Sequence, residues 1–532
     1  MNRRIRILPL LVAAALPAGF ARGDWLYDAP TQRMTELDPP GGGTPWILNC
    51  TGSGTDLAVA SVQQTGAGAV VDLRLPVRSA GGDAFSVVGV GIDAFRGNLS
   101  LEEIRLPDTL VSIGRGAFDG CTALRRVSPF LPDSVASIGV EAFRNVPAGG
   151  TLRLGFGGSL AFPPDDRGWN GSEHFRNTAV EEVAIGPGVA AVPWNAFLEC
   201  QALTNLDLRA ATSLSAIGVC SFLNCTALRR VDPLLPDTVA SIGAQAFAHD
   251  PIEGTLRLGF GGPLDLRDDE RGWNVENYFE DTRIGEVQFG PGVVNVKRGF
   301  ITGNPALSNV VFRTTALTAI GQAAFDGCTA LRRVEPLLPD TVVYLGSTAF
   351  NNTQVEGSLR IGFGGPVRFG TEFYGQSRLF WGSRISEVVA GPDVTNIPCY
   401  FACDCRRLTN VVLRGKNLVD IGEGAFSDCS ALEEITFRTF PLFAPYVFAR
   451  LPSTARFFVP DDVPAWQEWL DDPANATPWD DLPAAARDEY FARWDVHPSR
   501  PKWRAVGWYA PFPENSWVLR YIASEPTVLI VK

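Results

Sequence analysis

The residue types that usually perform acid-base chemistry are scarce in this chain. Only three histidines occur among 532 residues, at His174, His249 and His497. None of them has a partner at the spacing of a metal site or of a nucleophile motif. Carboxylate pairs are adjacent in sequence, whereas glycoside hydrolysis needs two carboxylates across a cleft. The sequence therefore argues against catalysis, and we expect neither enzyme activity nor a cofactor or metal.

A glycine-rich string could in principle cradle a phosphate. Residues Leu152–Gly158 form such a string, and near-copies begin at Leu256 and Leu359. A phosphate loop would not be needed three times, so the recurrence indicates turns of a repeating unit.

Side chains suited to binding do recur. Paired arginines follow the same Cys-Thr-Ala-Leu string three times, at Arg125, Arg126, Arg229, Arg230, Arg332 and Arg333. Two tryptophans, Trp169 and Trp273, lie in matching acidic insertions. The arginines could belong to a periodic face for a repeating ligand, and an exposed tryptophan suits carbohydrate or protein contact. The arginines could instead be a soluble surface copied by duplication, and the tryptophans could fold back over a repeat edge.

These residues are carried by a segment that ends in Ala-Phe and returns every 21 to 32 residues. Its phenylalanines are Phe95, Phe118, Phe143, Phe175, Phe197, Phe222, Phe247, Phe279, Phe300, Phe325, Phe350, Phe380, Phe401, Phe426 and Phe448. A period in this range is typical of a solenoid, in which each repeat buries its apolar side against its neighbours.

The pattern of one repeat predicts its local structure. Leu-x-x-Val/Ile reads as a short strand, Leu-Pro turns the chain, and Val-x-x-Ile-Gly forms the opposite wall. Glycines such as Gly114 and Gly139 suggest a corner with an unusual backbone angle. The Ala-Phe pair is expected to fill the core.

The sequence also repeats over a longer period that spans several of these segments. The string Cys-Thr-Ala-Leu-Arg-Arg-Val begins at Cys121, Cys225 and Cys328. A cassette of four repeats, about 103 residues long, has therefore been copied three times. Residues beside the strand core positions must point outward, so each cassette carries a basic, an acidic and a polar stripe. The acidic and polar stripes are Glu181, Glu182, Glu286 and Glu387, and Thr204, Asn205, Ser308, Asn309, Thr409 and Asn410.

The Leu-Pro, Ile-Gly, Ala-Phe and Cys pattern resembles the BspA-type leucine-rich repeat, from about Val70 to Pro460. The resemblance implies a β-rich solenoid of about 15 repeats with a short strand in each. Characterised members of that family look like adhesins that bind host or bacterial surfaces. The resemblance is specific for the fold and much less so for function.

Ten cysteines in an exported protein would suggest disulfides. Most of them, however, share one repeat position with two asparagines: Asn98, Cys121, Cys200, Cys225, Asn304, Cys328, Cys405 and Cys429. We expect these residues to form a buried structural ladder that caps turn amides. Of the four other cysteines, Cys399 and Cys403 form the pair expected to make a disulfide.

The ends of the chain differ from the array. Residues 1–23 read as a signal peptide, with three arginines before an apolar run. Residues 24–69 are predicted to be an N-terminal cap, 70–460 the repeat array, and 461–486 a helical C-terminal cap. Residues 487–532 are rich in aromatic residues and predict short strands, either an appended β-module or an attachment signal.

The net charge and the predicted export of the chain limit its possible partners and functions. The net charge of −12 disfavours nucleic acid and anionic membranes as partners. No transmembrane segment is expected, and the signal predicts a secreted or surface-displayed chain. The sequence favours an adhesin-like protein that binds extracellular protein or glycan through the strand face and the tryptophan loops. The alternative is an envelope scaffold that associates with its own copies.

Overall fold

The computed structural model consists of strands and turns. It describes residues 20–21, 23–39, 43–66, 68–164, 172–267, 277–370, 377–439, 441–444, 446–452, 455–458, 519–522 and 528–531. No helix occurs within these ranges. The chain divides into two compact units, residues 1–214 with 224–228 and residues 215–223 with 229–532.

Unit 1 begins with a closed barrel. Its strands are β1 (Trp25–Asp28), β2 (Arg33–Glu36), β3 (Ile47–Ser53), β4 (Asp56–Gln64), β6 (Val77–Ser79) and β7 (Ala84–Val90). They pair in the order β7-β4-β3-β2-β1-β6, and β6 pairs again with β7 to close the ring. Trp25 and Trp46 are buried, and their indole N–H groups donate to the carbonyls of Asp72 and Gly68. The barrel is the N-terminal cap, and it includes strands beyond residue 69.

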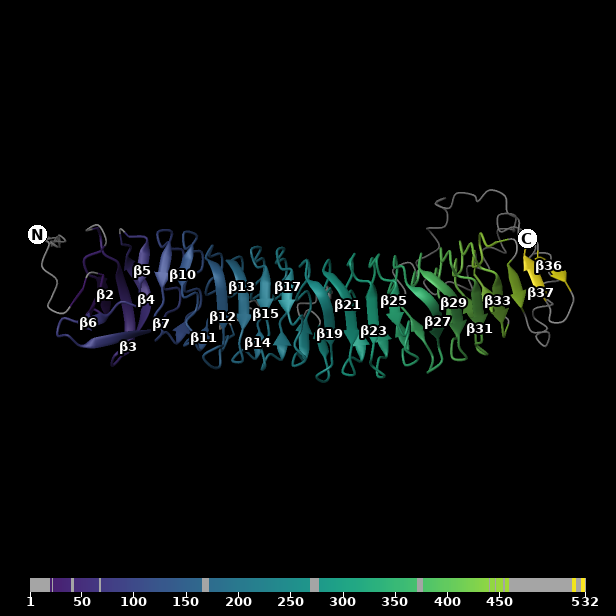
Figure 1. Ribbon diagram of the computed structural model, residues 1–532, viewed down its shortest axis with the longest axis horizontal. Helices are drawn as coiled ribbons and strands as arrows, with labels where there is room; N and C mark the ends of the chain where they lie inside the picture. Colours follow the sequence, from purple (N-terminus) through teal and green to yellow (C-terminus); the bar gives the residue numbers. More distant parts are fainter. Residues whose placement is uncertain are drawn as a thin grey trace, which may run out of the picture. The chain divides into compact units, whose positions relative to one another are not determined.

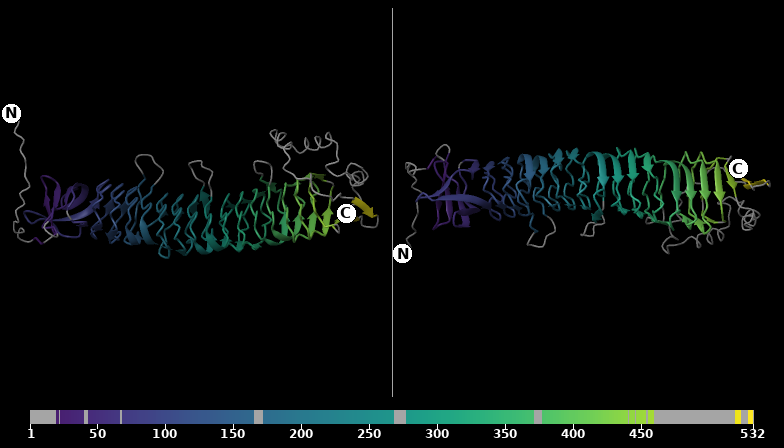
Figure 2. Two further views of the ribbon diagram at one scale, coloured as in Figure 1. Left: turned by 90° about the horizontal axis from the view of Figure 1, so that it is seen from above. Right: turned by 60° about the horizontal axis from the view of Figure 1, so that its bottom comes forward.

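The repeats of unit 1 continue from this cap. Strand β7 pairs in parallel with β9 (Ser112–Ile113), and β9 pairs with β11 (Ser137–Ile138). A second sheet holds β5 (Val70–Asp72), β8 (Glu103–Arg105) and β10 (Arg126–Ser128), again parallel. Strands β12 (Gly149–Leu154), β13 (Ala179–Ile185) and β15 (Asn205–Asp207) form the next parallel set, and β14 spans Ala191–Val192. Figure 2 shows the barrel strands in purple at the N-terminal end of these repeats.

Unit 2 also consists of parallel strands arranged in two rows, one row with the longer strands and the other with the shorter strands (Figure 1). The long-strand row holds β17 (Arg230–Asp232), β19 (Glu253–Leu258), β21 (Arg283–Phe289), β23 (Asn309–Phe312), β25 (Arg333–Glu335), β27 (Glu356–Ile361), β29 (Arg384–Ala390), β31 (Asn410–Leu413), β33 (Glu434–Phe437) and β35 (Arg456–Phe458). The other row holds β16 (Ala216–Ile217), β18 (Ser241–Gly243), β20 (Asp265–Arg267), β22 (Asn295–Val296), β24 (Ala319–Ile320), β26 (Tyr344–Leu345), β28 (Arg368–Phe369), β30 (Asn396–Ile397), β32 (Asp420–Ile421) and β34 (Leu442–Phe443). The predicted solenoid of short-stranded repeats is confirmed.

The phenylalanine of each repeat lies in the core between the two rows. Phe118 and Phe143 are fully buried, and their ring centroids are 5.1 Å apart with nearly parallel planes. The same stacking joins Phe325, Phe350 and Phe380, at 5.2 and 5.3 Å. At Phe300 and Phe401 of unit 2, the ring is instead edge-on to the rings of the neighbouring repeats. Phe289 also contacts Phe300, and Phe369 also contacts Phe401. A continuous aromatic column therefore stabilises each unit.

The turn around each Ala-Phe pair is strained but well bonded. In most repeats the residues two before and two after the phenylalanine have positive φ, as in Glu141 at 59° and Asn145 at 58°. Around Phe300 and Phe401 the positive φ angles fall one residue later, so Ile301 and Ala402 occupy the usual phenylalanine position. Three backbone amides of one turn donate to the carbonyls of the next, as Gly116, Phe118 and Gly120 do at 2.8 to 2.9 Å. These hydrogen bonds offset the cost of left-handed backbone at non-glycine residues.

The prediction that the Ile-Gly glycines have an unusual backbone angle is wrong. Gly114 and Gly139 do not have positive φ, whereas Gly116, two positions later, has φ of 58°. A Cβ on Gly139 would lie only 2.3 Å from the backbone nitrogen of Arg115. The glycine is needed because the backbones of neighbouring repeats approach closely there.

The C-terminal end of unit 2 closes the strand row with a hairpin. Strand β37 (Val528–Val531) pairs antiparallel with β35 and with β36 (Leu519–Ile522). Within residues 487–532 the structure describes only the two strands β36 and β37. The proposed helical cap at 461–486 lies outside the described residues.

Candidate functional site

Each four-repeat cassette presents the same row of polar side chains on its long strands. In unit 1, Thr151 pairs in register with Glu182, and Glu182 pairs with Asn205. Thr151 Oγ1 donates to Glu182 Oε2 at 3.2 Å, and Asn205 Nδ2 donates to Glu182 Oε1 at 2.5 Å. The carboxylate is thus held in one orientation between a hydroxyl and an amide.

The row recurs twice in unit 2. Ser358 Oγ donates to Glu387 Oε2 at 2.6 Å, and Asn410 Nδ2 donates to Glu387 Oε1 at 3.0 Å. In the other copy, Thr255, Glu286 and Asn309 occupy the same registers, but Gln288 Nε2 donates to Glu286 Oε1. We call these three sets the hydroxyl-Glu-Asn rows.

A glycine bulge precedes each row. The register shifts by one residue after Gly150, Gly254 and Gly357, whose φ angles are 103°, 119° and 109°. Nothing lies within 4 Å of a Cβ built on any of the three. Glycine is needed at these positions because it alone adopts this backbone angle without strain. Since glycine has no side chain and no atom lies close, a stretch of backbone stays uncovered beside each row.

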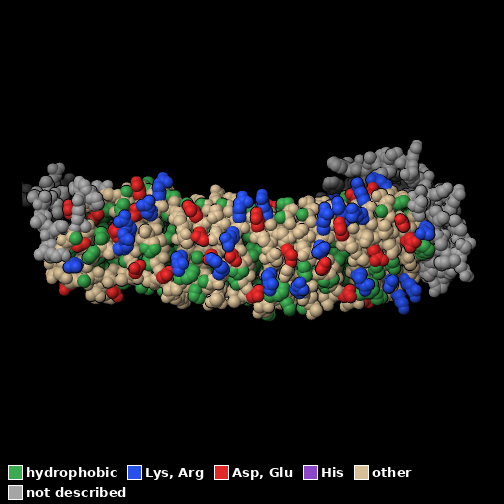
Figure 3. Space-filling model, viewed as in Figure 1, with side chains coloured by type: hydrophobic (Ala, Val, Ile, Leu, Met, Phe, Trp, Pro, Cys, Tyr) green, Lys and Arg blue, Asp and Glu red, His purple; other side chains and the backbone are tan. Residues whose placement is uncertain are grey.

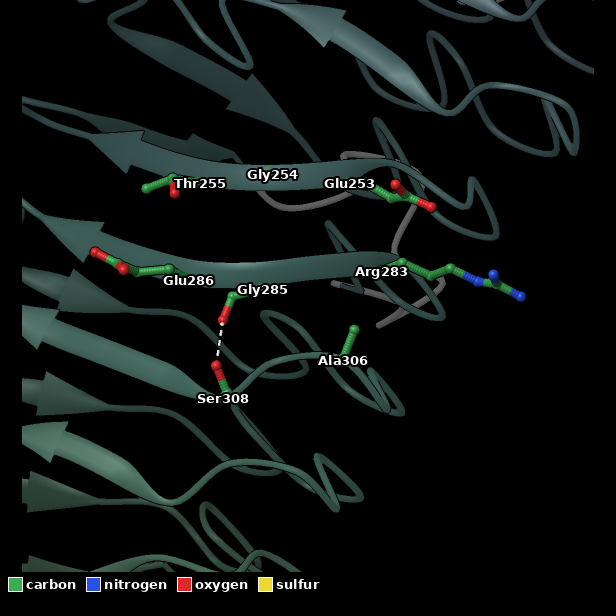
Figure 4. A pocket seen from close by; sticks show the side chains of 8 residues that line it. All are labelled: Glu253, Gly254, Thr255, Arg283, Gly285, Glu286, Ala306 and Ser308. Atoms are coloured by element: carbon green, nitrogen blue, oxygen red, sulfur yellow. Dashed lines mark hydrogen bonds between the residues drawn. The ribbon is translucent and has the colours of Figure 1, made fainter.

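A shallow hollow marks this place in unit 2 (Figure 4). Its volume is about 490 Å³, and its lining residues are Glu253, Gly254, Thr255, Arg283, Gly285, Glu286, Ala306 and Ser308. Ser308 Oγ donates to the carbonyl of Gly285 at 3.1 Å, while Glu253 and Arg283 project from the strand starts. Hydroxyls, carboxylates and exposed backbone suit hydrogen bonding to a polar ligand rather than burial of an apolar one.

The predicted arginine pairs lie at the start of strands β10, β17 and β25. The side chains of Arg126, Arg230 and Arg333 are 72%, 69% and 72% exposed and make ion pairs at 3.2, 3.2 and 3.6 Å. Their neighbours Arg125, Arg229 and Arg332 are exposed and make no ion pair with any described residue. Arg333 is in register with Asn309, so within unit 2 the basic pair extends the hydroxyl-Glu-Asn row.

Other arginines of the outward stripes are held by aromatic rings. The guanidinium of Arg153 lies 3.9 Å from the ring centroid of Phe156, and Arg257 and Arg360 lie at 4.2 and 4.1 Å from Phe260 and Phe363. Such cation-π contacts fix the side chain along the strand. These arginines contribute to packing, unlike the paired arginines.

The two predicted tryptophans are not among the residues that the structure describes. Trp169 and Trp273 lie outside the described residues, as do the acidic residues beside them. Their role as ligand contacts stays a prediction.

The ladder residues are buried at equivalent turns, except Asn98, which is more exposed. Asn304 Oδ1 accepts from the amides of Ala306 and Leu307, and its Nδ2 donates to Thr282 Oγ1 and to the carbonyl of Ile284. Asn98 accepts from the amides of Ser100 and Leu101. The asparagines therefore cap turn amides as expected.

The cysteines make a different bond. Each thiol donates to a carbonyl of the preceding repeat's turn, as Cys121 does to Phe95 at 2.9 Å and Cys328 to Ile301 at 3.0 Å. The same holds for Cys200, Cys225, Cys405 and Cys429, at 3.0 to 3.2 Å. The expectation of amide capping is thus corrected for cysteine, because a thiol is a donor to oxygen here and ties two repeats together.

The expected disulfide between Cys399 and Cys403 is absent. All ten cysteines are thiols, and the Sγ of Cys403 lies 3.1 Å from Ser427 Oγ in the next repeat. Cys403 is turned into the core by this contact.

Burial is expected to make three of the ladder thiols unreactive. It raises the pKa of Cys121 to about 11 and those of Cys328 and Cys405 to about 12. Because the thiolate is the nucleophile, we expect these cysteines to resist iodoacetamide at pH 8 in the folded chain and to react after denaturation. Mass spectrometry of the alkylated peptides measures this. Rapid labelling of Cys328 in folded protein would contradict the ladder geometry.

The raised pKa values of these thiols also make the free energy of unfolding depend on pH. The folded-state pKa values of Cys328 and Cys405, about 12, lie above the value of about 8.5 for a free thiol. Each thiol therefore stabilises the fold fully below about pH 8.5, and this contribution falls as pH rises toward the folded value.

The described histidines are placed in structural positions. His174 is fully buried against Phe162, and burial lowers its pKa to about 3. His249 Nδ1 lies 2.9 Å from Asp281 Oδ2 on the turns. His497 lies outside the described residues. Within the described part of the chain, no group of three or more His, Cys, Asp or Glu side chains could hold a metal ion.

Sequence reasoning missed a chain of ion pairs along the turns of unit 1. Arg144 contacts Asp119 at 2.8 Å, Glu141 at 2.7 Å and Glu173 at 3.3 Å. Arg96 extends this chain to Asp93, and Arg176 extends it to Glu199. The carboxylates raise the pKa of Arg144 through hydrogen bonding to Asp119, despite partial burial. The signal was present, because each of the three arginines directly follows the phenylalanine of its repeat.

Two rows of parallel strands, one phenylalanine per turn and a Cys/Asn ladder define a leucine-rich-repeat solenoid. The family model described as "BspA type Leucine rich repeat region (6 copies)" matches residues 89–153, 171–255, 275–362 and 375–468, more than half of the chain. The chain belongs to this family of BspA-type leucine-rich-repeat proteins. A comparison with curated proteins found no significant match.

Solved structures with a similar fold come from several bacteria. A leucine-rich repeat protein from Bacteroides ovatus is 17% identical, with a TM-score of 0.42, over 78% of this chain and 98% of that one. A leucine-rich cell surface protein from Faecalibacterium prausnitzii is 18% identical, with a TM-score of 0.33, over 76% and 95%. The pneumococcal vaccine antigen PcpA is 15% identical, with a TM-score of 0.31, over 83% and 94%. The family assignment rests on the family model alone. No helix among the described residues has the length and apolarity needed to span a membrane.

Proposed function

We propose that this chain is a secreted or cell-surface binding protein, adhesin-like, that recognises extracellular protein or glycan. The binding surface is the face of the long strands, together with the insertions that carry Trp169 and Trp273. Membership of a leucine-rich-repeat family supports a binding role. Catalysis is not part of the proposal.

The hydroxyl-Glu-Asn rows are the observation that carries it. In two of the three rows, two side-chain hydrogen bonds orient the carboxylate. Beside every row lies a glycine at which an added Cβ would meet nothing within 4 Å. Adjacent strands lie about 4.8 Å apart, so matching rows within unit 2 recur about every 19 Å. A surface that repeats at this interval suits a ligand that repeats as well, such as a polymer or a fibrous protein.

The side chains of the rows have the chemistry that such a ligand needs. Carboxylates accept hydrogen bonds from hydroxyl and amide groups, and charge-assisted bonds are the stronger ones. The rows are preorganised, so a ligand loses less free energy to ordering them.

The test is a binding screen with the full chain. Arrays of extracellular matrix proteins, serum proteins and glycans are probed at physiological salt, and hits are measured by calorimetry. We expect a defined class of protein or glycan to bind. A blank array together with concentration-dependent assembly in analytical ultracentrifugation would favour the scaffold alternative and contradict the proposal.

A further inference from the structure

Arginines gather at the starts of neighbouring long strands in the third cassette, within unit 2. Glu356 lies at the start of β27 and is in register with Arg384 on β29. The amide of Glu356 donates to the carbonyl of Arg332, which precedes β25, and Arg407 precedes β31. Figure 3 shows Lys and Arg side chains crowded at the upper edge over this part of unit 2. We call Arg332, Arg384 and Arg407 the arginine cluster.

One glutamate serves two of these arginines. Glu356 Oε1 lies 3.7 Å from Arg384 Nη1 and 3.8 Å from Arg407 Nη1. Arg332 makes no ion pair with any residue in the described ranges. Three arginines around one glutamate give a local charge of +2 on a chain whose net charge is −12. The cluster is thus an exposed cationic site with unused hydrogen-bond donors.

The cluster is not a plain copy of the other cassettes. The second cassette has Glu253 and Arg283 at the places of Glu356 and Arg384, but Ala306 at the place of Arg407. The first cassette has Ala202 there. The extra positive charge is therefore a property of the third cassette, which a simple duplication of a soluble surface does not explain.

The surroundings are polar and lack apolar anchors. Ser358, Ser386 and Thr409 are exposed on the same strands. The exposed large apolar residues in the described ranges all lie elsewhere: Ile92, Leu99, Val111, Val294, Val343, Tyr344 and Val419. Protein interfaces usually centre on buried aromatic or aliphatic anchors. A hydroxyl-rich anionic polymer fits this surface better than a folded protein does.

We propose that the arginine cluster binds the carboxylate or sulfate groups of an acidic polysaccharide. Planar guanidinium groups recognise such anions with paired hydrogen bonds. The cluster spans three strand spacings, about 14 Å, which is enough for an oligosaccharide segment rather than a single ion. This inference rests on the proposed function and names the ligand class for one part of the strand face.

The experiment compares the full chain with the variant R332Q/R384Q/R407Q. The probes are polygalacturonate, which carries carboxylates, and heparin, which also carries sulfates. Neutral dextran and poly-glutamate are the comparison polymers. We expect the wild-type chain to bind at least one acidic polysaccharide, and the variant to bind it at least about tenfold more weakly. Raising the salt concentration is expected to weaken the wild-type binding, because exposed charges are screened.

The control variant is R313Q/R368Q/R414Q, which removes the same charge from exposed arginines away from the cluster. Its affinity is expected to stay within about twofold of wild type, since its residues take no part in the site. Three results would overturn the inference: no binding of either acidic polysaccharide, equal losses in both variants, or poly-glutamate binding as tightly as the polysaccharides. If the wild-type chain binds other ligands on the arrays while this site fails, the proposed function stands without the inference.

Discussion

Replacement of Phe350 by alanine is expected to destabilise unit 2 by about 3–5 kcal/mol. Its ring is fully buried between Phe325 and Phe380, with centroids 5.2 and 5.3 Å away. The truncation leaves a cavity in the aromatic column that both neighbouring rings line. Because a repeat contacts mainly its neighbours in a solenoid, we expect the loss to be concentrated there.

Hydrogen exchange followed by mass spectrometry locates that loss. Amides of the turns around Phe325 and Phe380 should exchange much faster in Phe350→Ala, while the barrel of unit 1 keeps its protection. Phe350→Leu is the matched control, since it keeps most of the volume and should cost less than about 2 kcal/mol. Uniform exchange rates in wild type and Phe350→Ala would show that the column does not stabilise the repeats.

Replacement of Asn304 by leucine is expected to cost at least about 3 kcal/mol. The fully buried amide group makes four hydrogen bonds, two accepted from backbone amides and two donated. Leucine has a similar size but leaves all four partners without their bond. The penalty for burying unsatisfied groups therefore decides the result, rather than a cavity.

Asn304→Cys is the informative comparison. Cysteine occupies the same slot six times and donates one bond to the preceding turn. We expect it to cost about 1–2 kcal/mol, clearly less than leucine, because a thiol here can contact Thr282 Oγ1 as Cys200 contacts Thr178 Oγ1, which regains one of the four partners. Urea unfolding of the three chains gives the ranking. Equal stability of the leucine and cysteine variants would show that hydrogen bonding at the ladder is unimportant.

The core of the solenoid could be predicted from the sequence because its signal is periodic. A phenylalanine returns in each repeat, and a ladder residue and an Ile-Gly pair return in several of them. The structure buries the phenylalanines, although Phe300 and Phe401 occupy the position that precedes the usual one. Short-range patterns of this kind are determined by packing between identical neighbours. The barrel at the N-terminus could not be predicted in the same way, since its six strands are of unequal length and pair partly antiparallel.

The candidate site was only partly accessible from the sequence. The outward stripes were identified, but the hydrogen bonds that join Thr151, Glu182 and Asn205 depend on a register shift after Gly150. A bulge changes which residues face each other without changing the repeat pattern. The ring contact of Arg153 with Phe156 was also hidden, because it gives an outward arginine a structural role.

We propose the strand face as the binding surface of this chain. The most direct test measures the affinity of an array-identified ligand for the variant E182K/E286K/E387K, which reverses the carboxylate in all three rows. The control D133K/D237K/D340K makes the same charge change at exposed acids of the Leu-Pro turns. We expect at least about tenfold weaker binding for the row variant only, while both variants still fold and melt cooperatively. Equal affinity of the row variant and wild type would contradict it.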